Sequence, residues 1–312
     1  MAIRRFQSAD LPEVEGLWNR FYPARFRLDL EMLRLHTVDS PAFDFDASFA
    51  VADGASFVAC SLIKSSATPT LYPGGEARHA HLCAFACASP DSGDEALRAS
   101  IDAVRRRGAT RLVLGQDSRH LLPGCPDDAL GLRASLERVG FRRGGEIFDL
   151  ERDLQDYRPR PLPEGSAFRP LDEADMKTLD RLLKDEFSPR WRFDVTDKAR
   201  REGPECVFGL FVDGSLSGFA LLQQEGAKLP LGGAVWRASL GPNWCSLGPI
   251  GVVKALRGRG LGDALLGSAL ERLRDRGARR CIIDWTVLAS FYEAHGFAVT
   301  RRYTAMSLDL AT

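Results

Sequence analysis

The feature of this sequence that most limits its fold is a weak internal repeat. Residues 3–10 are echoed by residues 168–175, and in each copy a short strand-like run leads into a helix-like segment with acidic residues at its start. A hairpin signal follows in both copies, because alternating apolar runs flank an Asp-Gly pair at residues 53–54 and again at 213–214. The two halves of the chain are therefore expected to share one fold.

The order of the later segments is repeated as well. Amphipathic helices expected at residues 94–107 and 263–276 are each followed by a Gly-Ala pair and an apolar strand. A second helix in each half ends at a Gly-Phe pair, at residues 140–141 and 296–297, before a last strand. This order predicts two α/β domains of common ancestry.

The domain boundaries follow from length and composition. A chain of 312 residues exceeds the usual allowance of about 100–200 residues per domain, so two domains are expected. A Pro-rich stretch at residues 156–165 is typical of an extended linker. We therefore expect one domain at residues 1–155 and a second at 166–312.

The composition argues against several classes of partner. Lys plus Arg and Asp plus Glu each number 42, so net charge gives no support for nucleic-acid binding. No stretch approaches the roughly 18 apolar residues that span a membrane, and none follows Met1 as a signal segment. The seven cysteines are odd in number and scattered, which indicates reduced thiols and a cytoplasmic location. No metal is expected, because no second ligand pair follows at zinc-site spacing.

A glycine-rich segment at Arg257–Gly262 follows a strand-like run and precedes the helix at residues 263–276. Unpaired N–H groups and the helix dipole at such a junction attract anions, and Arg257 and Arg259 add positive charge. The plain alternative is a turn before a surface helix. A Rossmann site is disfavoured, because the segment follows a late strand rather than the first strand of a βαβ unit.

Two motifs together resemble a known family. Arg257-x-x-Gly260-x-Gly262, after a strand that contains Val252, resembles the acyl-CoA pyrophosphate motif of the GNAT N-acyltransferase superfamily. About 35 residues downstream, residues 290–297 resemble the helix end of the same family, Phe-Tyr-x-x-x-Gly-Phe. The resemblance implies two tandem domains, each with a mixed, mostly antiparallel sheet flanked by helices, with the functional motifs in the second half.

The resemblance also implies acetyl-CoA as co-substrate and identifies the residues that would hold it. The main chain of one segment would bind the pyrophosphate: Arg257, Gly258, Arg259, Gly260, Leu261 and Gly262. Strand residues would pair with pantetheine: Ile250, Gly251 and Val252. Two positions depart from the family pattern. Lys254 stands where many members have Pro, and Trp285 stands where many have an Asn that contacts pantetheine.

Catalytic roles fall on two residues. Tyr292 resembles the general acid that protonates the departing thiolate, and its alternative role is a core aromatic with a hydrated hydroxyl. An alkylamine is about one part in a thousand neutral at pH 7, so a base or a water chain must accept its proton. Asp284 is a candidate base, with capping the next helix or pairing with an arginine as open alternatives. Trp285 either lines the acyl or acceptor pocket or packs in the core.

The acceptor side is expected to come from the early helices and from a loop at residues 187–192. This loop carries Arg190 and Arg192 around Trp191, which suits an acidic or planar acceptor, and an ordinary surface loop is the alternative. The sequence leaves the acceptor open as a small-molecule or peptide amine. It also leaves an oligomeric state open.

The first half lacks the functional motifs. Its counterpart of the glycine-rich segment is residues 88–93, which contain Asp91, and a carboxylate repels phosphate. Leu136 stands where the second half has Tyr292. We expect this half not to catalyse the reaction and to shape the acceptor cleft or an interdomain interface.

These observations give three hypotheses for function. The first is an N-acetyltransferase that transfers an acetyl, or a longer acyl, group to a primary amine. The second is an inert acyl-CoA-binding sensor or interaction protein, against which the intact Arg257, Gly260, Gly262 and Tyr292 argue. The third is a protein that uses the glycine-rich segment for another phosphate ligand, such as ATP or NAD.

Overall fold

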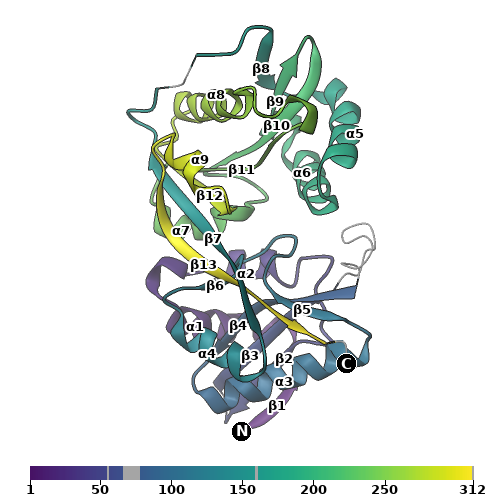
Figure 1. The fold of residues 1–312 in the computed structure, drawn as a ribbon. Coiled ribbons are helices and arrows are strands. Elements are labelled where there is room, and N and C mark those ends of the chain that lie inside the picture. The colour runs from purple at the N-terminus through teal and green to yellow at the C-terminus, as the bar shows by residue number, and fades with distance from the viewer. Residues whose placement is uncertain (55, 66–77, 159–160, 311–312) are drawn as a thin grey trace. The chain divides into compact units, whose positions relative to one another are not determined.

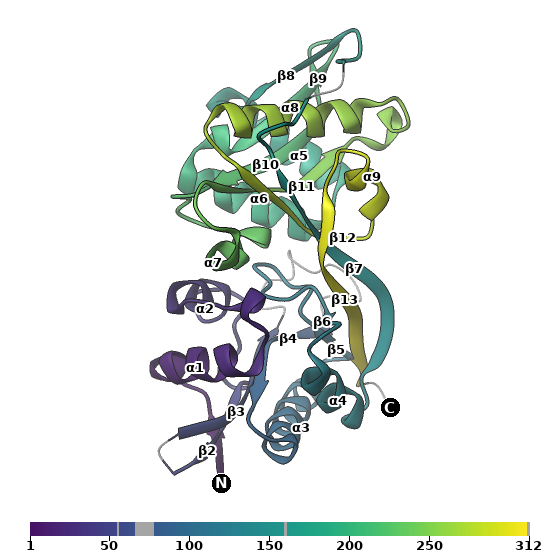
Figure 2. The same cartoon turned by 90° about the vertical axis from the view of Figure 1, so that its left-hand side faces the viewer.

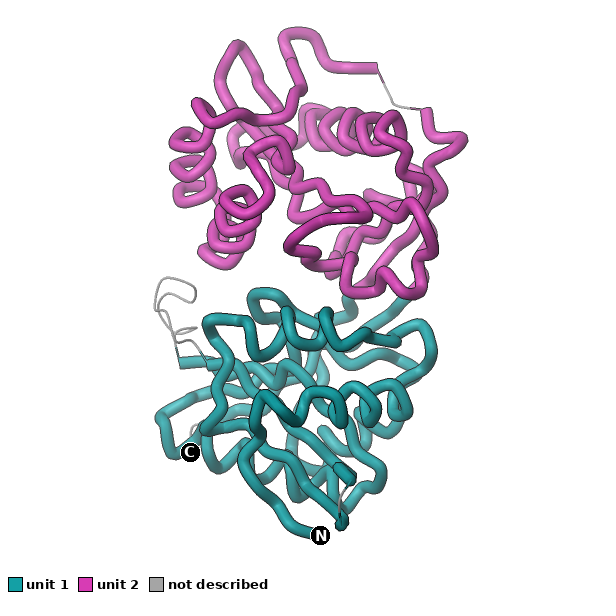
Figure 3. Tube along the Cα trace, turned by 180° about the vertical axis from the view of Figure 1, so that it is seen from behind, with its two compact units in different colours: residues 1–147, 301–312 teal, residues 148–300 magenta. Residues whose placement is uncertain are grey.

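The computed structural model describes residues 1–54, 56–65, 78–158 and 161–310. Residues 159 and 160 of the expected linker lie outside the described residues. The chain forms two compact units, shown in different colours in Figure 3. Unit 1 contains residues 1–147 and 301–312, and unit 2 contains residues 148–300.

Unit 1 is built around a sheet in the order β1-β2-β3-β4-β5-β13, in which only the β4–β5 pair is parallel. Its first strands are β1 (Ala2–Arg5), β2 (Phe49–Asp53), β3 (Ser56–Ser65), β4 (His79–Cys87), β5 (Arg111–Leu114) and β6 (Cys125–Pro126). Its helices are α1 (Leu11–Phe21), α2 (Leu30–His36), α3 (Pro90–Arg106) and α4 (Leu130–Arg138). Figure 2 shows α1 and α3 packed beside β3.

Unit 2 has a sheet in the order β7-β12-β11-β10-β9-β8, in which only the β11–β12 pair is parallel. Its strands are β7 (Arg142–Asp153, from residue 148), β8 (Ser166–Pro170), β9 (Val207–Val212), β10 (Ser215–Gln224), β11 (Trp244–Val252), β12 (Arg280–Thr286) and the start of β13 (Ala298–Asp309). Its helices are α5 (Met176–Glu186), α6 (Pro189–Glu202), α7 (Arg237–Leu240), α8 (Leu261–Asp275) and α9 (Ala289–Glu293), with 3-10 turns η6 (Gly232–Trp236) and η7 (Lys254–Leu256).

The two units have the same strand order, and each is closed by a strand from the other half of the chain. In unit 1, residues 307–309 of β13 pair with β5. In unit 2, residues 148–153 of β7 pair with β12. The two units divide at residues 147–148 and 300–301.

The hairpin signals correspond to real hairpins. β2 pairs with β3 and β9 pairs with β10, both antiparallel. At the second turn Asp213 has φ 49° and Gly214 has φ 76°. Two positive φ values match the right-handed twist of the flanking strands, which is why Asp-Gly is favoured there. The prediction of a mixed, mostly antiparallel sheet flanked by helices is confirmed.

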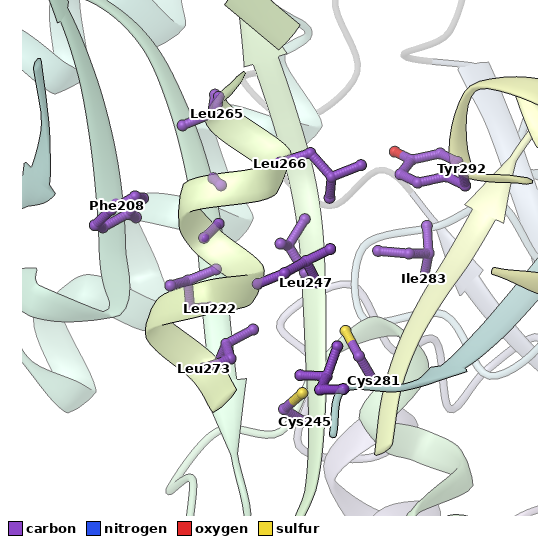
Figure 4. Close-up of a cluster of buried hydrophobic side chains, with 14 of the residues drawn as sticks. Phe208, Leu222, Cys245, Leu247, Leu265, Leu266, Leu273, Cys281, Ile283 and Tyr292 are labelled. Atoms are coloured by element: carbon purple, nitrogen blue, oxygen red, sulfur yellow. The ribbon is translucent and has the colours of Figure 1, made fainter. Parts of the chain in front are cut away.

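The sheet of unit 2 buries both faces. Alternate residues of β10 face opposite sides, so Ala220 and Leu222 join one cluster while Phe219 and Leu221 join the other. The first cluster is covered by α8, whose leucines pack on β9, β10 and β11 (Figure 4). The second is covered by α5 and α6, which lie apart from α8 in Figure 1. The sheet between these layers positions the site described below.

All seven cysteines are free thiols. In the part of the chain that the structure describes, no helix is both long enough and apolar enough to cross a membrane.

Candidate active site

The central feature of unit 2 is the point where two parallel strands separate. β11 and β12 are in register at only three positions, from Trp244↔Arg280 to Ser246↔Ile282. β11 then continues to Val252 and β12 continues to Thr286 without further pairing between them. A gap between two strands of one sheet leaves main-chain groups available to an added extended chain.

A β-bulge in each strand lies at this separation. Gly248 and Pro249 of β11 together face one residue of β10, because the register jumps from Leu222↔Leu247 to Ala220↔Ile250. In β12, residues 284 and 285 lie in the corresponding jump between Ile283 and Thr286. Bulges bend a strand and re-aim its side chains, and they are frequent beside active sites. Here they bend the strands at the point where pairing ends.

The register of β11 with β10 shows which main-chain groups face the gap. Val253 donates its N–H to the Ser217 carbonyl at 2.9 Å, so alternation directs the main chain of Gly251 towards β10. The N–H and C=O groups of Ile250 and Val252 then point away from β10. Gly251 has a packing role on its other side, because a Cβ there would lie 2.3 Å from the Phe187 ring. Ile250 and Val252 are the residues whose main chain suits the predicted pairing with pantetheine.

The glycine-rich segment follows directly and opens α8. Gly260 is the N-cap of α8 with φ 74°, and Gly258 has φ 77°. A Cβ at either glycine would meet nothing within 4 Å, so the segment borders open space. The first N–H groups of a helix have no intrahelical acceptor. The segment therefore presents main-chain donors and the positive end of the α8 dipole, which suit a diphosphate.

The two arginines of this segment differ. Arg257 donates from Nε to the Val252 carbonyl at 2.9 Å. This bond ties the segment back to the end of β11 and fixes the direction in which the N–H groups point. Arg259 is exposed and stands beside the two glycines, where its charge adds to the potential.

A row of hydrogen bonds between side chains, centred on the buried His295, supports the first turn of α8. His295 is 4% exposed, and its Nε2 lies 3.1 Å from Asp263 Oδ1 while its Nδ1 lies 3.0 Å from the Tyr157 hydroxyl. The contact fixes the helix start against the segment that follows α9. The sequence showed His295 only as an unassigned position inside the Tyr292–Phe297 motif.

Tyr292 lies on α9 and is 6% exposed. Burial, followed by the nearby Asp284 carboxylate, raises the pKa of its phenol above the ordinary value, while a hydrogen bond with Thr286 opposes the change. In Figure 4 its hydroxyl points towards Leu266 on α8. A phenol with a raised pKa keeps its proton at neutral pH, as a general acid must. Its ring also belongs to the core cluster, as the packing alternative expects.

Asp284 lies at the bulge of β12, beside the bulge of β11. A Cβ placed on Gly232 would lie 2.7 Å from its Oδ1, and one on Gly248 would lie 3.8 Å from the same oxygen. Its carboxylate therefore sits against η6 and the bulge of β11. The Asp284 carboxylate contributes to the raised pKa of Tyr292, so the two side chains lie near one another. Asp284 is half-buried.

Trp285 occupies the second position of the bulge with φ 44°, and Arg190 lies over its ring with 4.1 Å between Cζ and the centroid. The prediction of a loop at residues 187–192 is wrong, because helix α6 begins at Pro189 and Ser188 is its N-cap. Arg192 binds Asp180 at 2.7 Å, and Trp191 stacks on Phe187. Only Arg190 of the two arginines contacts a residue of the site.

One site residue escaped the sequence reasoning. Asp149 of β7 is fully buried and accepts the Trp285 N–H at 3.1 Å across a separation of 136 residues. No local pattern links the two positions. The contact becomes predictable only once β7 is known to pair with β12 in unit 2.

The corresponding region of unit 1 is built differently. Most of the expected loop at residues 88–93 is helical, since α3 begins at Pro90. Pro90 has no N–H, and the Ser89 side chain accepts from the Ser92 N–H, so the helix start offers fewer donors. The pairing of β4 with β5 runs over four positions, from His79↔Arg111 to Leu82↔Leu114, and Gly115 then donates to the Leu82 carbonyl. The start of α3 therefore offers fewer main-chain donors than the start of α8.

Comparisons with known proteins agree with this geometry. The model of the acetyltransferase (GNAT) family matches residues 174–298. Among curated proteins, none matches the sequence.

Solved structures match along nearly the whole chain. A fungal GCN5-related glucosamine N-acetyltransferase region of a multi-domain GH3 beta-N-acetylglucosaminidase superimposes with a TM-score of 0.87 at 19% identity, over 98% of this chain and 38% of that chain. A GCN5-related N-acetyltransferase from Sphaerobacter thermophilus gives 0.70 at 16% identity, over 100% and 96%. A tandem GNAT protein from the clavulanic acid biosynthesis pathway gives 0.67 at 14% identity, over 100% and 99%.

At such identities the likeness concerns the fold, while the family model covers the segment with the glycine-rich loop, Asp284 and Tyr292. Residues 174–298 form a domain of the acetyltransferase (GNAT) family, in a chain whose whole length has the fold of GNAT proteins.

Proposed function

We propose that the protein transfers an acetyl group from acetyl-CoA to a primary amine, at the site of unit 2. The observation that carries this proposal is the separation of β11 from β12 directly before the glycine-rich start of α8. An extended pantetheine chain needs main-chain partners, and its diphosphate needs converging N–H groups. The main chain of Ile250 and Val252 suits the pantetheine, and the N–H groups of residues 257–262, which follow closely in the sequence, suit the diphosphate.

The chemistry follows from the groups around the gap. Acetyl-CoA supplies an activated thioester, and its carbonyl carbon is attacked by the acceptor nitrogen. Asp284 accepts the proton that the amine must lose, and Tyr292 donates its phenolic proton to the sulfur as the C–S bond breaks. The products are an amide and the CoA thiol. Direct transfer needs no cysteine nucleophile, which agrees with the burial of Cys245 and Cys281 in the core.

A small-molecule amine is the acceptor class to test first. The structure with the highest similarity score among those described above is named as a glucosamine N-acetyltransferase region, so amino sugars belong in the panel beside simple alkylamines and short peptides. Unit 1, in which the start of α3 offers fewer main-chain donors, is proposed as a non-catalytic GNAT-like domain, and residues 166–312 with β7 as the catalytic one.

The test is release of the CoA thiol from acetyl-CoA with each amine of the panel, compared with the Tyr292→Phe variant. We expect amine-dependent release that the variant lacks. Binding of acetyl-CoA without turnover for any amine would favour the inert sensor. Binding of ATP or NAD in place of CoA would favour the nucleotide-binding alternative.

A further inference from the structure

Asp149 is a buried carboxylate that the proposed mechanism does not use. It lies on β7 with no exposed surface, and its Oδ1 accepts the Trp285 main-chain N–H at 3.1 Å. Placing a carboxylate in the interior is costly unless hydrogen bonds satisfy it. The Asp149 side chain therefore supplies the acceptor for a main-chain donor of the sheet, the Trp285 N–H.

That position is the bulge of β12. Register between β7 and β12 breaks between Ile283 and Thr286, and Trp285 has φ 44° inside the break. Positive φ is an outlier for a bulky residue and persists only where the surroundings enforce it. The Asp149 carboxylate replaces the ladder bond that the bulge removes, and so holds Trp285 in this conformation. Arg190 covers the Trp285 ring at 4.1 Å and holds it from another element, α6.

The bulge decides where Asp284 points. Asp284 and Trp285 together lie opposite the single residue Asp149, so the bulge bends the strand at Asp284 and sets the direction of its carboxylate. With the bulge in place, the carboxylate lies against Gly232 and Gly248 at the gap between the strands. The position of the Asp284 carboxylate thus depends on the hydrogen bond that the adjacent Trp285 makes to Asp149.

We propose that Asp149 is a positioning residue that keeps the β12 bulge, and through it the Asp284 carboxylate, in the geometry for acyl transfer. This inference rests on the proposed function. It assigns a residue of the first half of the chain to the site of the second, so a segment that starts at residue 166 lacks part of the site.

The test compares full-length Asp149→Ala and Asp149→Asn with wild type, using CoA release and calorimetric binding of acetyl-CoA. The alanine variant loses the acceptor, and we expect kcat to fall about 100-fold, the effect of a displacement of about 1 Å in a catalytic group. The Kd of acetyl-CoA stays unchanged, because the cradle at residues 257–262 is not altered. The asparagine variant keeps an oxygen at Oδ1, so it recovers most of the rate with an unchanged pH profile.

Glu151→Ala is the matched control. Glu151 is a carboxylate on the same strand that pairs with Arg280 at 3.5 Å and accepts from Thr300, away from the bulge. We expect its kcat to equal that of wild type. If Asp149→Ala does not fold, the same comparison is made in a Trp285→Gly background, because glycine adopts φ 44° without strain and the bulge no longer needs the bond.

Three results overturn the proposal. Full activity of Asp149→Ala would show that the bond is not needed, and equal loss in the alanine and asparagine variants would show that the charge itself acts. In the glycine background, an undiminished effect of Asp149→Ala would show that the bulge is not the route. A wild type that turns over no amine would instead refute the proposed function, and this inference with it.

Discussion

Gly232 offers a way to move the Asp284 carboxylate without changing it. In Gly232→Ala the new Cβ would lie 2.7 Å from Oδ1, whereas ordinary contacts begin at 3.4 Å, so the oxygen must retreat by 3.4 − 2.7 = 0.7 Å. A misplacement of about 1 Å can cost about 100-fold in rate, so we expect kcat to fall between about 10-fold and about 100-fold. This range corresponds to about 1.4–2.7 kcal/mol of activation free energy.

The variant also has a backbone cost that must be separated from the displacement. Gly232 has φ 54°, and a residue with a Cβ in that region costs about 1–2 kcal/mol. Gly226→Ala is the matched control in the same β10–β11 connection, since Gly226 has φ 89° and a Cβ there would meet nothing within 4 Å. Both variants should lose comparable free energy of unfolding, which thermal melting measures.

The assay is steady-state CoA release at saturating acetyl-CoA, with calorimetry to confirm unchanged cofactor affinity. We expect slow turnover in Gly232→Ala only. Equal turnover in the two variants would show that the carboxylate position does not matter, and Asp284 would lose its role as base.

The remaining predictions concern the proposed acid and the glycine-rich segment. Tyr292→Phe should lower kcat by at least about 100-fold with little change in acetyl-CoA affinity, as removal of a general acid does. Because burial and Asp284 raise the pKa of Tyr292, the protonated acid persists as pH rises, so wild-type kcat should not decline through this group below about pH 10, and a pH–rate profile checks the sign. Arg257→Ala removes the bond to the Val252 carbonyl, worth about 1.5–3 kcal/mol for a charged donor, and should weaken acetyl-CoA binding about 10-fold to about 100-fold. Arg259→Ala, at an exposed position, should have a smaller effect that fades with salt, and equal losses in calorimetry would contradict the distinction.

Much of the fold could be predicted from local sequence signals. Asp213-Gly214 fixes its hairpin because both residues adopt positive φ, and Gly260 marks the start of α8 for the same reason. The start of α6 is also marked locally, since Ser188-Pro189 is a common N-cap and first-turn pair. These features depend on a few adjacent residues.

The features that escaped prediction depend on distant pairing. Strands β7 and β13 have similar patterns, and nothing local indicates which sheet each one closes. The bulges at residues 248–249 and 284–285 arise from register with neighbouring strands, not from composition alone. The contact between Asp149 and Trp285 depends on two such features, the pairing of β7 in unit 2 and the bulge at Trp285. Local patterns therefore predicted the glycine-rich start of α8 and the helix that carries Tyr292, whereas the contact between Asp149 and Trp285 depends on distant pairing.

The central claim is that the main-chain donors at the start of α8 bind the diphosphate of CoA, and calorimetric titration with CoA tests it most directly. Gly260→Asp places a carboxylate at the N-cap, and Gly241→Asp places the same charge at a glycine of similar φ, 78° against 74°, before the opposite end of β11. We predict a binding heat for wild type and for Gly241→Asp, and none for Gly260→Asp. No heat with the wild-type protein, or undiminished binding by Gly260→Asp, would contradict the account.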